Sequence, residues 1–138
     1  MFFLVYLSAA VTWFSSKELH DMLATCRANN ERDGLTGMLL YKDGNFMQVL
    51  EGEEPAVRAL QQRIAADLRH RGMIVIDSGP TPAREFGAWS MAFTDISTHN
   101  ASLPNGYSEF MDTPLSDPAF VNNPERCHQL LQMFRQID

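Results

Sequence analysis

Three polar side chains in this sequence could together hold a ligand. Gln48 stands in the middle of an apolar run that ends at Gly52, Tyr6 lies within the apolar segment 2–8, and Asn30 lies near the end of a helical segment. A buried amide or phenol must find hydrogen-bond partners out of water. An amide, a phenol and a second amide that converge in an apolar slot suit a flat heterocycle with polar atoms along its edge.

Each amide also has a simpler interpretation when taken alone. A glutamine in a central strand usually bonds only a neighbouring backbone or side-chain group. The pair Asn29-Asn30 is typical of the end of a helix, because asparagine tolerates left-handed backbone geometry. The ligand hypothesis therefore depends on whether the fold brings Tyr6, Asn30 and Gln48 together.

Gln48 belongs to a predicted hairpin over residues 34–52, with the turn at Asp43-Gly44. This dipeptide favours a type I′ turn, in which both central residues have positive φ. Both flanking runs are almost continuously apolar, which is typical of strands that are covered on both faces. By the two-residue period of a strand, Gln48 shares a face with Phe46 and Leu50.

Capping signals and periodicity predict the other elements. Ser15 and Glu18 form a capping box at the start of a helix that ends near residues 28–30. Pro55 suits the first turn of a second helix, which Gly72 is expected to stop. The further expected elements are strands at residues 2–8, 73–76 and 89–93 and a last helix from residues 123–124 to the end.

The element order β-α-β-β-α-β-β predicts an α+β fold. We expect a ferredoxin-like, five-stranded mixed sheet with two helices on one face. This domain would cover residues 1–97, and residues 98–138 would form a C-terminal helical extension. The extension would cover the open sheet face or contact a second copy of the chain in a homodimer or larger assembly. Its apolar face consists of Cys127, Leu130, Leu131, Phe134 and Ile137.

Composition excludes several classes of partner and site. A formal net charge of −6 argues against binding to duplex nucleic acid or to an anionic membrane surface, because both favour a basic face. The two cysteines are far apart in sequence, which favours free thiols in a reducing compartment. The four histidines lack metal-ligand spacing. The apolar N-terminal run has no preceding basic residue and is too short to span a bilayer, so we expect a buried strand in a cytoplasmic protein.

The second predicted helix adds charged residues to the candidate site. In the predicted topology, the strands that carry Tyr6 and Gln48 are adjacent, and this helix brings Ile64 and its charged neighbours beside them. Arg63 and Asp67 are one turn apart, so a solvated ion pair is the simple alternative to a binding role. The positive residues 69–71 likewise suit the C-terminal end of a helix dipole.

Five separated motifs, taken in order, resemble a known family. The chain is similar to a BLUF domain, a blue-light sensor that uses flavin, over residues 2–95. Gly-Leu-Thr-Gly alone would be a weak match, and Leu35 is a conservative departure from the isoleucine that is also common there. The motifs are Leu-Val-Tyr-Leu-Ser at 4–8, Asn-Asn-Glu-Arg-Asp-Gly-Leu-Thr-Gly at 29–37, Phe-Met-Gln-Val-Leu-Glu-Gly at 46–52, Arg-Ile-Ala-Ala-Asp-Leu-Arg-His at 63–70 and Trp-Ser-Met at 89–91.

This resemblance implies a role for each candidate residue. Asn30 would bond the pyrimidine edge of the isoalloxazine ring, and Gln48 would lie between the Tyr6 hydroxyl and the N5/O4 edge. Other residues would pack against the faces of the ring, would line its rim or the ribityl and phosphate end of the cofactor, or would relay the signal. The walls are Met22 and Ile64, the rim positions are Arg63, Asp67, Arg69 and His70, and the relay positions are Trp89 and Met91.

The resemblance also implies a function. The chain would be a blue-light photoreceptor, and not an enzyme, that binds flavin non-covalently, as FAD or else as FMN or riboflavin. Light would drive electron and proton transfer from Tyr6 to the flavin and rearrange the hydrogen bonds of Gln48. Short members of the family act through a separate protein, so we expect an unidentified downstream signalling partner.

Other functions on a ferredoxin-like sheet remain as alternatives. A flavin- or nucleotide-binding enzyme is the main one, although no nucleophile with an orienting base supports it. An acylphosphatase-like enzyme would need an Arg and an Asn at one phosphate-binding loop, and Asn30 and Arg32 are not obviously so placed. An RNA-binding sheet would need exposed aromatic residues and a basic surface.

Overall fold

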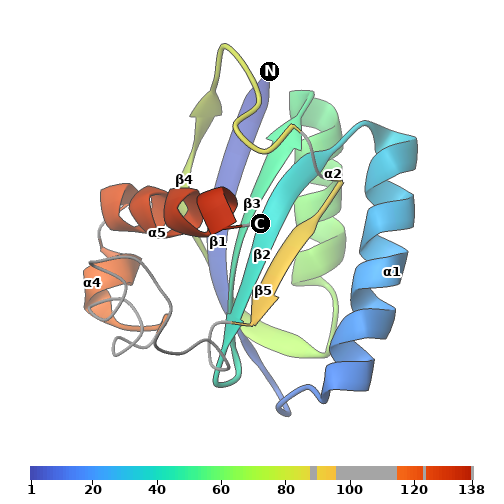
Figure 1. Cartoon of the computed structure of the whole chain (residues 1–138), viewed down its shortest axis with the longest axis vertical. Helices are drawn as coiled ribbons and strands as arrows, with labels where there is room; N and C mark the ends of the chain where they lie inside the picture. Colours follow the sequence, from blue (N-terminus) through green and yellow to red (C-terminus); the bar gives the residue numbers. More distant parts are fainter. Residues whose placement is uncertain (88–89, 96–114, 123, 138) are drawn as a thin grey trace.

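The chain folds around one sheet with helices on both of its faces. The computed structural model describes residues 1–87, 90–95, 115–122 and 124–137. Figure 1 shows α1 (Ser16–Asp33) and α2 (Glu54–Ala65) on one side of the sheet, and α4 (Pro118–Val121) and α5 (Pro124–Ile137) on the other.

The sheet has the strand order β4-β1-β3-β2-β5. Neighbours from β4 to β2 are antiparallel, and the short strand β5 pairs parallel with β2. The α+β class is confirmed, and so is the expectation that the strands carrying Tyr6 and Gln48 are adjacent. The strands are β1 (Phe2–Ala10), β2 (Thr36–Lys42), β3 (Asn45–Gly52), β4 (His70–Pro80) and β5 (Ala92–Asp95).

The hairpin of β2 and β3 forms as its turn residues predict. Asp43 and Gly44 have φ values of 48° and 84°, the two positive values that a type I′ turn requires. Six of the seven residues of β2 and seven of the eight residues of β3 are buried, so the expectation of strands covered on both faces is confirmed.

Two apolar cores lie on opposite faces of the sheet. The alternation of side chains along β3 sends Phe46 and Leu50 toward α1 and α2, and sends Met47 and Val49 toward the C-terminal helices. On that second face, Cys127, Leu130 and Leu131 of α5 are buried. The C-terminal segment therefore covers the open sheet face, as expected; the side chains of Phe134 and Ile137 lie outside the described residues.

The first helix begins as predicted but ends one turn later. The capping box of Ser15 and Glu18 is present at its start. Its end is set by Gly34, which has φ 71° and whose N–H bonds the carbonyl of Asn30. Asn30 consequently lies inside the helix and is buried, and the interpretation of the asparagine pair as the helix end is wrong.

The second helix is shorter than predicted, and the strand after it is longer. α2 ends at Ala65 and β4 begins at His70, so the expected continuation of the helix to residue 71 is wrong. The Asp67 carboxylate accepts a hydrogen bond from the backbone N–H of Arg69 at 2.9 Å, which stabilises a turn in place of helix. Leu68, which comes four residues after Ile64 and would have continued the apolar face of a longer helix, is 90% exposed.

The last strand starts later than its sequence pattern suggests. β5 begins at Ala92, and the predicted start at Trp89 lies outside the described residues. Ser90 and Met91 do not pair with β2, and their carbonyl groups accept hydrogen bonds from side chains of α1.

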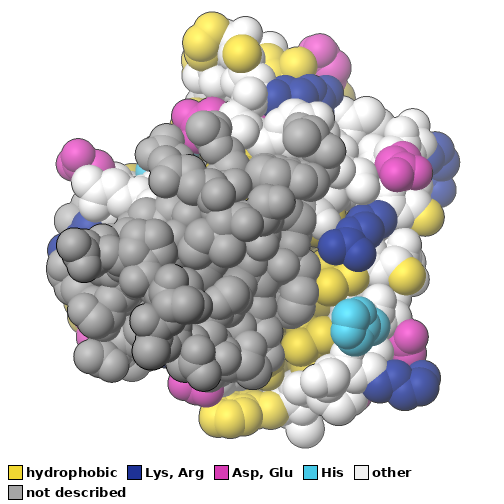
Figure 2. Space-filling model, viewed as in Figure 1, with side chains coloured by type: hydrophobic (Ala, Val, Ile, Leu, Met, Phe, Trp, Pro, Cys, Tyr) yellow, Lys and Arg dark blue, Asp and Glu magenta, His cyan; other side chains and the backbone are white. Residues whose placement is uncertain are grey.

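The surface seen in Figure 2 carries charges of both signs. Basic and acidic side chains are interspersed along the side formed by α1. Within the described residues, no helix is both long and apolar enough to cross a membrane.

Gly37 provides a test of the packing between β2 and β3. A Cβ added there would lie 2.0 Å from the carbonyl oxygen of Val49, which is backbone and cannot move aside. We expect Gly37→Ala to lower the free energy of unfolding by about 2–3 kcal/mol, measured by urea denaturation. In Gly79→Ala, the new Cβ would meet only the Phe3 ring at 3.8 Å. This control should change stability by less than about 1 kcal/mol, and equal effects of the two changes would contradict the packing argument.

Candidate functional site

Two adjoining cavities lie between the sheet and the helices α1 and α2. The inner cavity, about 80 Å³, is lined by sheet residues that include Tyr6 and Gln48, and the outer cavity, about 460 Å³, lies along the two helices. The volume of the outer cavity is in the usual range for a small-molecule site. Both cavities share the lining residues Phe14, Met22, Cys26, Ile64, Asp67 and Arg69.

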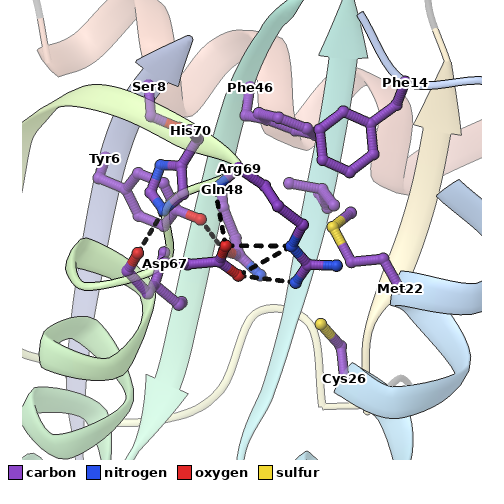
Figure 3. A pocket seen from close by; sticks show the side chains of 12 residues that line it. Tyr6, Ser8, Phe14, Met22, Cys26, Phe46, Gln48, Asp67, Arg69 and His70 are labelled. Atoms are coloured by element: carbon purple, nitrogen blue, oxygen red, sulfur yellow. Dashed lines mark hydrogen bonds and ion pairs between the residues drawn. The ribbon is translucent and has the colours of Figure 1, made fainter. Parts of the chain in front are cut away.

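Tyr6 and Gln48 form a buried polar pair at the wall of the inner cavity. They are direct cross-strand partners in the register of β1 and β3, and the Tyr6 hydroxyl donates a hydrogen bond to Gln48 Oε1 (Figure 3). Burial raises the pKa of Tyr6 above its ordinary value, so the phenol stays neutral and keeps its proton as a donor. The structure therefore brings together two of the three predicted polar residues.

The Gln48 amide nitrogen has a weak partner. Gln48 Nε2 lies 3.3 Å from Met91 Sδ, and within the described residues this sulfur is the partner of that nitrogen. A thioether is a poor acceptor compared with oxygen. The amide can therefore exchange this bond for a better one at small cost.

Asn30 occupies a different place from the one expected. It is buried and its Nδ2 donates to the carbonyl of Ser90 at 2.7 Å, but it is not among the residues that line the two cavities. Met91, a predicted relay residue, is buried against Gln48. Trp89, the other one, lies outside the described residues.

Charged residues of the α2–β4 connection lie at the mouth of the site. Arg69 pairs with Asp67 at 2.6 Å, and Figure 3 shows the Arg69 guanidinium between Asp67 and Met22. The hydrogen bonds from Arg69 hold the pKa of Asp67 below its ordinary value. Arg63 instead pairs with Asp33 at 3.4 Å, so the alternative of an Arg63–Asp67 ion pair is wrong, because the helix ends before Asp67.

His70 presents an unpaired nitrogen at the inner cavity. Its Nε2 contacts the carbonyl of Ile64, while its Nδ1 is buried and has no hydrogen-bond partner among the described residues. If Nε2 carries the proton for that contact, Nδ1 is an acceptor. A bound molecule with an N–H or O–H group could satisfy it.

Several lining residues were not predicted. Phe14 and Phe46 pack edge to face at the inner cavity, and Cys26 of α1 points its thiol toward the site (Figure 3). Cys26 lies four residues after Met22, so helical spacing alone could have placed it on the same face. Burial raises the pKa of the Cys26 thiol.

The comparisons with known proteins agree on a family. Residues 1–92 match the BLUF family model, described as sensors of blue-light using FAD. The photoactivated adenylate cyclase subunit alpha of Euglena gracilis is 37% identical over 95 residues, which are 67% of this chain and 9% of that protein. The blue light- and temperature-regulated antirepressor BluF of Escherichia coli K12 is 31% identical over 103 residues, which are 70% of this chain and 26% of that protein.

A solved structure is similar over nearly the whole chain. The dark-state structure of the BLUF protein BlrB has a TM-score of 0.80 and 27% sequence identity, and the match covers 99% of this chain and 96% of that one. The two curated relatives are much longer proteins, since this chain spans about a tenth and a quarter of their lengths.

The residues of the site fit a flavin. An isoalloxazine ring is flat and apolar on its faces, with donors and acceptors along its edge. The cavities offer apolar walls at Met22, Ile64 and Phe46, a weakly bonded amide at Gln48 and an unpaired acceptor at His70. This donor set suits a heterocycle better than a metal ion, and the described residues contain no metal-binding cluster.

Cys26 reports whether the cavity takes up the ligand. Its thiol lines both cavities, whereas Cys127 lies on the buried face of α5 and has a pKa raised to about 12. We expect FAD at about ten times its Kd to slow iodoacetamide modification of Cys26 roughly tenfold, measured by mass spectrometry. The Cys127 rate is the internal control and should not change. Equal Cys26 rates with and without FAD would mean that flavin binds elsewhere.

Proposed function

Because the chain belongs to the BLUF family, the sensors of blue-light using FAD, we propose that it is a blue-light receptor that holds flavin non-covalently in the inner and outer cavities. The observation that carries this proposal is the buried Tyr6–Gln48 hydrogen bond at the cavity wall. It combines an electron-rich phenol with an amide that has a weak second partner.

We assign the flavin-holding residues by their place in the cavities. Met22 and Ile64 lie on either side of the ring, one on each helix. Asn30 does not line either cavity; we assign it to the pyrimidine edge from the family resemblance, through its second N–H, because the first bonds the Ser90 carbonyl. The four remaining assigned residues hold the ribityl and phosphate end or the rim. These are Arg63, Asp67, Arg69 and His70. FAD is the form named by the family, and FMN or riboflavin could occupy the same ring site.

The chemistry of the site follows from the Tyr6–Gln48 pair. When bound, the flavin supplies a strong oxidant on absorbing blue light. Tyr6 would donate the electron while its hydroxyl proton leaves along the hydrogen bond to Gln48 Oε1, and Tyr6 would regain both when the electron returns. The Gln48 amide then rotates or tautomerises, which exchanges its weak bond to the Met91 sulfur for a stronger one. The protein supplies placement and electrostatics, while the photochemistry belongs to the cofactor.

The signal leaves the site through the segment that enters β5. Met91 contacts Gln48 directly, and Trp89 precedes it in sequence. We propose that residues 1–97 are the sensor domain and that the extension of residues 98–138 passes the change to a separate protein, so the chain acts as a receptor and not as an enzyme. Cys127, Leu130 and Leu131, the apolar residues of α5 whose side chains the structure describes, pack on the chain's own sheet, so these three do not require a second copy of the chain.

Blue-light spectroscopy tests the receptor function. Purified protein loaded with FAD should be yellow, and blue light should shift its absorption reversibly to longer wavelength, because the rearranged Gln48 donates a stronger hydrogen bond to the ring. Tyr6→Phe removes the donor hydroxyl but keeps the ring that packs in the core. It should bind FAD and lose the shift, and a normal photocycle in this variant would rule out Tyr6 as the donor.

Gln48→Leu tests the amide separately from the phenol. Leucine fills a similar space without hydrogen-bonding groups, so the variant should retain FAD and lose the red shift. Light-induced absorption difference spectra at equal flavin occupancy provide the measurement. A variant that shifts like the wild type would show that the Gln48 hydrogen bonds are not the origin of the signal.

A further inference from the structure

Two side chains of α1 hold the backbone that leads into β5. Arg27 Nε donates to the carbonyl of Met91 at 2.9 Å, and Asn30 Nδ2 donates to the carbonyl of Ser90 at 2.7 Å. Arg27 and Asn30 are three residues apart and so lie on one face of the helix. We call this pair of contacts the α1 clamp.

Met91 is the point where the clamp meets the photoactive pair. Its carbonyl is bonded by Arg27, and its sulfur, on a side chain that is 2% exposed, accepts from Gln48 Nε2. The next residue, Ala92, is the first to pair with β2. Met91 therefore connects the Gln48 amide, the helix α1 and the strand β5.

Of the two hydrogen bonds to Met91, the one from Gln48 to its sulfur is weaker than the one from Arg27 to its carbonyl. A guanidinium donor to a carbonyl is a charge-assisted hydrogen bond, whereas an amide donor to a thioether is among the weakest. When Gln48 turns away, Met91 keeps its position only if its backbone is held from another direction. In the described structure that hold comes from Arg27.

We propose that Arg27 is a positioning residue for the photoactive pair: its guanidinium holds the Met91 carbonyl so that the sulfur stays within reach of Gln48, and this contact sets how fast the dark arrangement returns. The inference rests on the function proposed above. Loss of the contact lets residues 90–91 relax around the turned amide, which prolongs the light state. The red shift itself is retained, because the Tyr6–Gln48 bond is untouched.

Dark recovery in Arg27→Met tests this role. Methionine keeps the helix propensity and most of the side-chain length but removes the donor. After a blue-light pulse on the FAD-loaded protein, the red-shifted absorption should have its normal amplitude and decay roughly threefold or more slowly than in the wild type. Lys17→Met removes a cation from an exposed position of the same helix and is the matched control. A smaller slowing, a faster decay or an equal effect of the control overturns the proposal.

Hydrogen exchange measures the clamp without flavin. In the dark and without FAD, the amides of residues 91–95 should exchange faster in Arg27→Met than in the wild type, while those of β1 and β3 should be unchanged. If exchange in Arg27→Met were faster by the same factor at all amides, or were unchanged at residues 91–95, the proposal would be wrong. Arg27→Leu, whose side chain has no hydrogen-bond donor, is used in the same two measurements if Arg27→Met does not fold. If the FAD-loaded wild type showed no red shift, the proposed receptor function would be wrong. The exchange measurement would still show whether Arg27 holds the backbone at Met91.

Discussion

The hydrogen bond between Tyr6 and Gln48 depends on the register of β1 and β3. The two residues are direct partners, and each lies among apolar neighbours on the face that packs against α1 and α2. A slip of one residue would turn Gln48 toward the C-terminal helices and leave the phenol opposite an apolar side chain. The turn at Asp43 and Gly44 and the close approach of Gly37 to the Val49 carbonyl fix the position of β3, so they also fix the chemistry.

The opposite face of the sheet holds the approach to β5 in place. The buried carboxylate of Glu51 accepts hydrogen bonds from the backbone N–H groups of Glu85 at 2.6 Å and Phe86 at 2.9 Å. Arg84 bonds the carbonyls of Gly34 and Glu51. The connection from β4 is therefore anchored just before the segment that the α1 clamp holds, and Met91 lies between two fixed regions.

Local sequence patterns predicted the parts of the fold that local interactions determine. The Asp43-Gly44 turn, the Ser15–Glu18 box and the shared face of Phe46, Gln48 and Leu50 follow from turn chemistry, capping and strand period. The end of α2 was missed, because the Asp67 carboxylate competes with the helix for a backbone N–H and periodicity does not detect that competition.

The remaining errors come from contacts between distant segments. Just before β5 begins, Arg27 and Asn30 bond carbonyls about sixty residues away, and no pattern within a short window can indicate such contacts. Cys26 and Phe14 became part of the site through the packing of α1 on the sheet. The candidate polar residues could be named from the sequence and the family resemblance, whereas their hydrogen-bond partners had to come from the fold.

The irregular pairing of β4 has a consequence for association between molecules. β4 is at the edge of the sheet, and its pairing with β1 shifts register twice, between Val5 and Tyr6 and again between Leu7 and Ala9. Gly72, with φ 66°, lies at the second shift. Such bulges break the regular row of free N–H and C=O groups that a straight edge would offer to another strand. Ile74 and Val75 can therefore stay partly exposed at this edge without templating the growth of the sheet into aggregates.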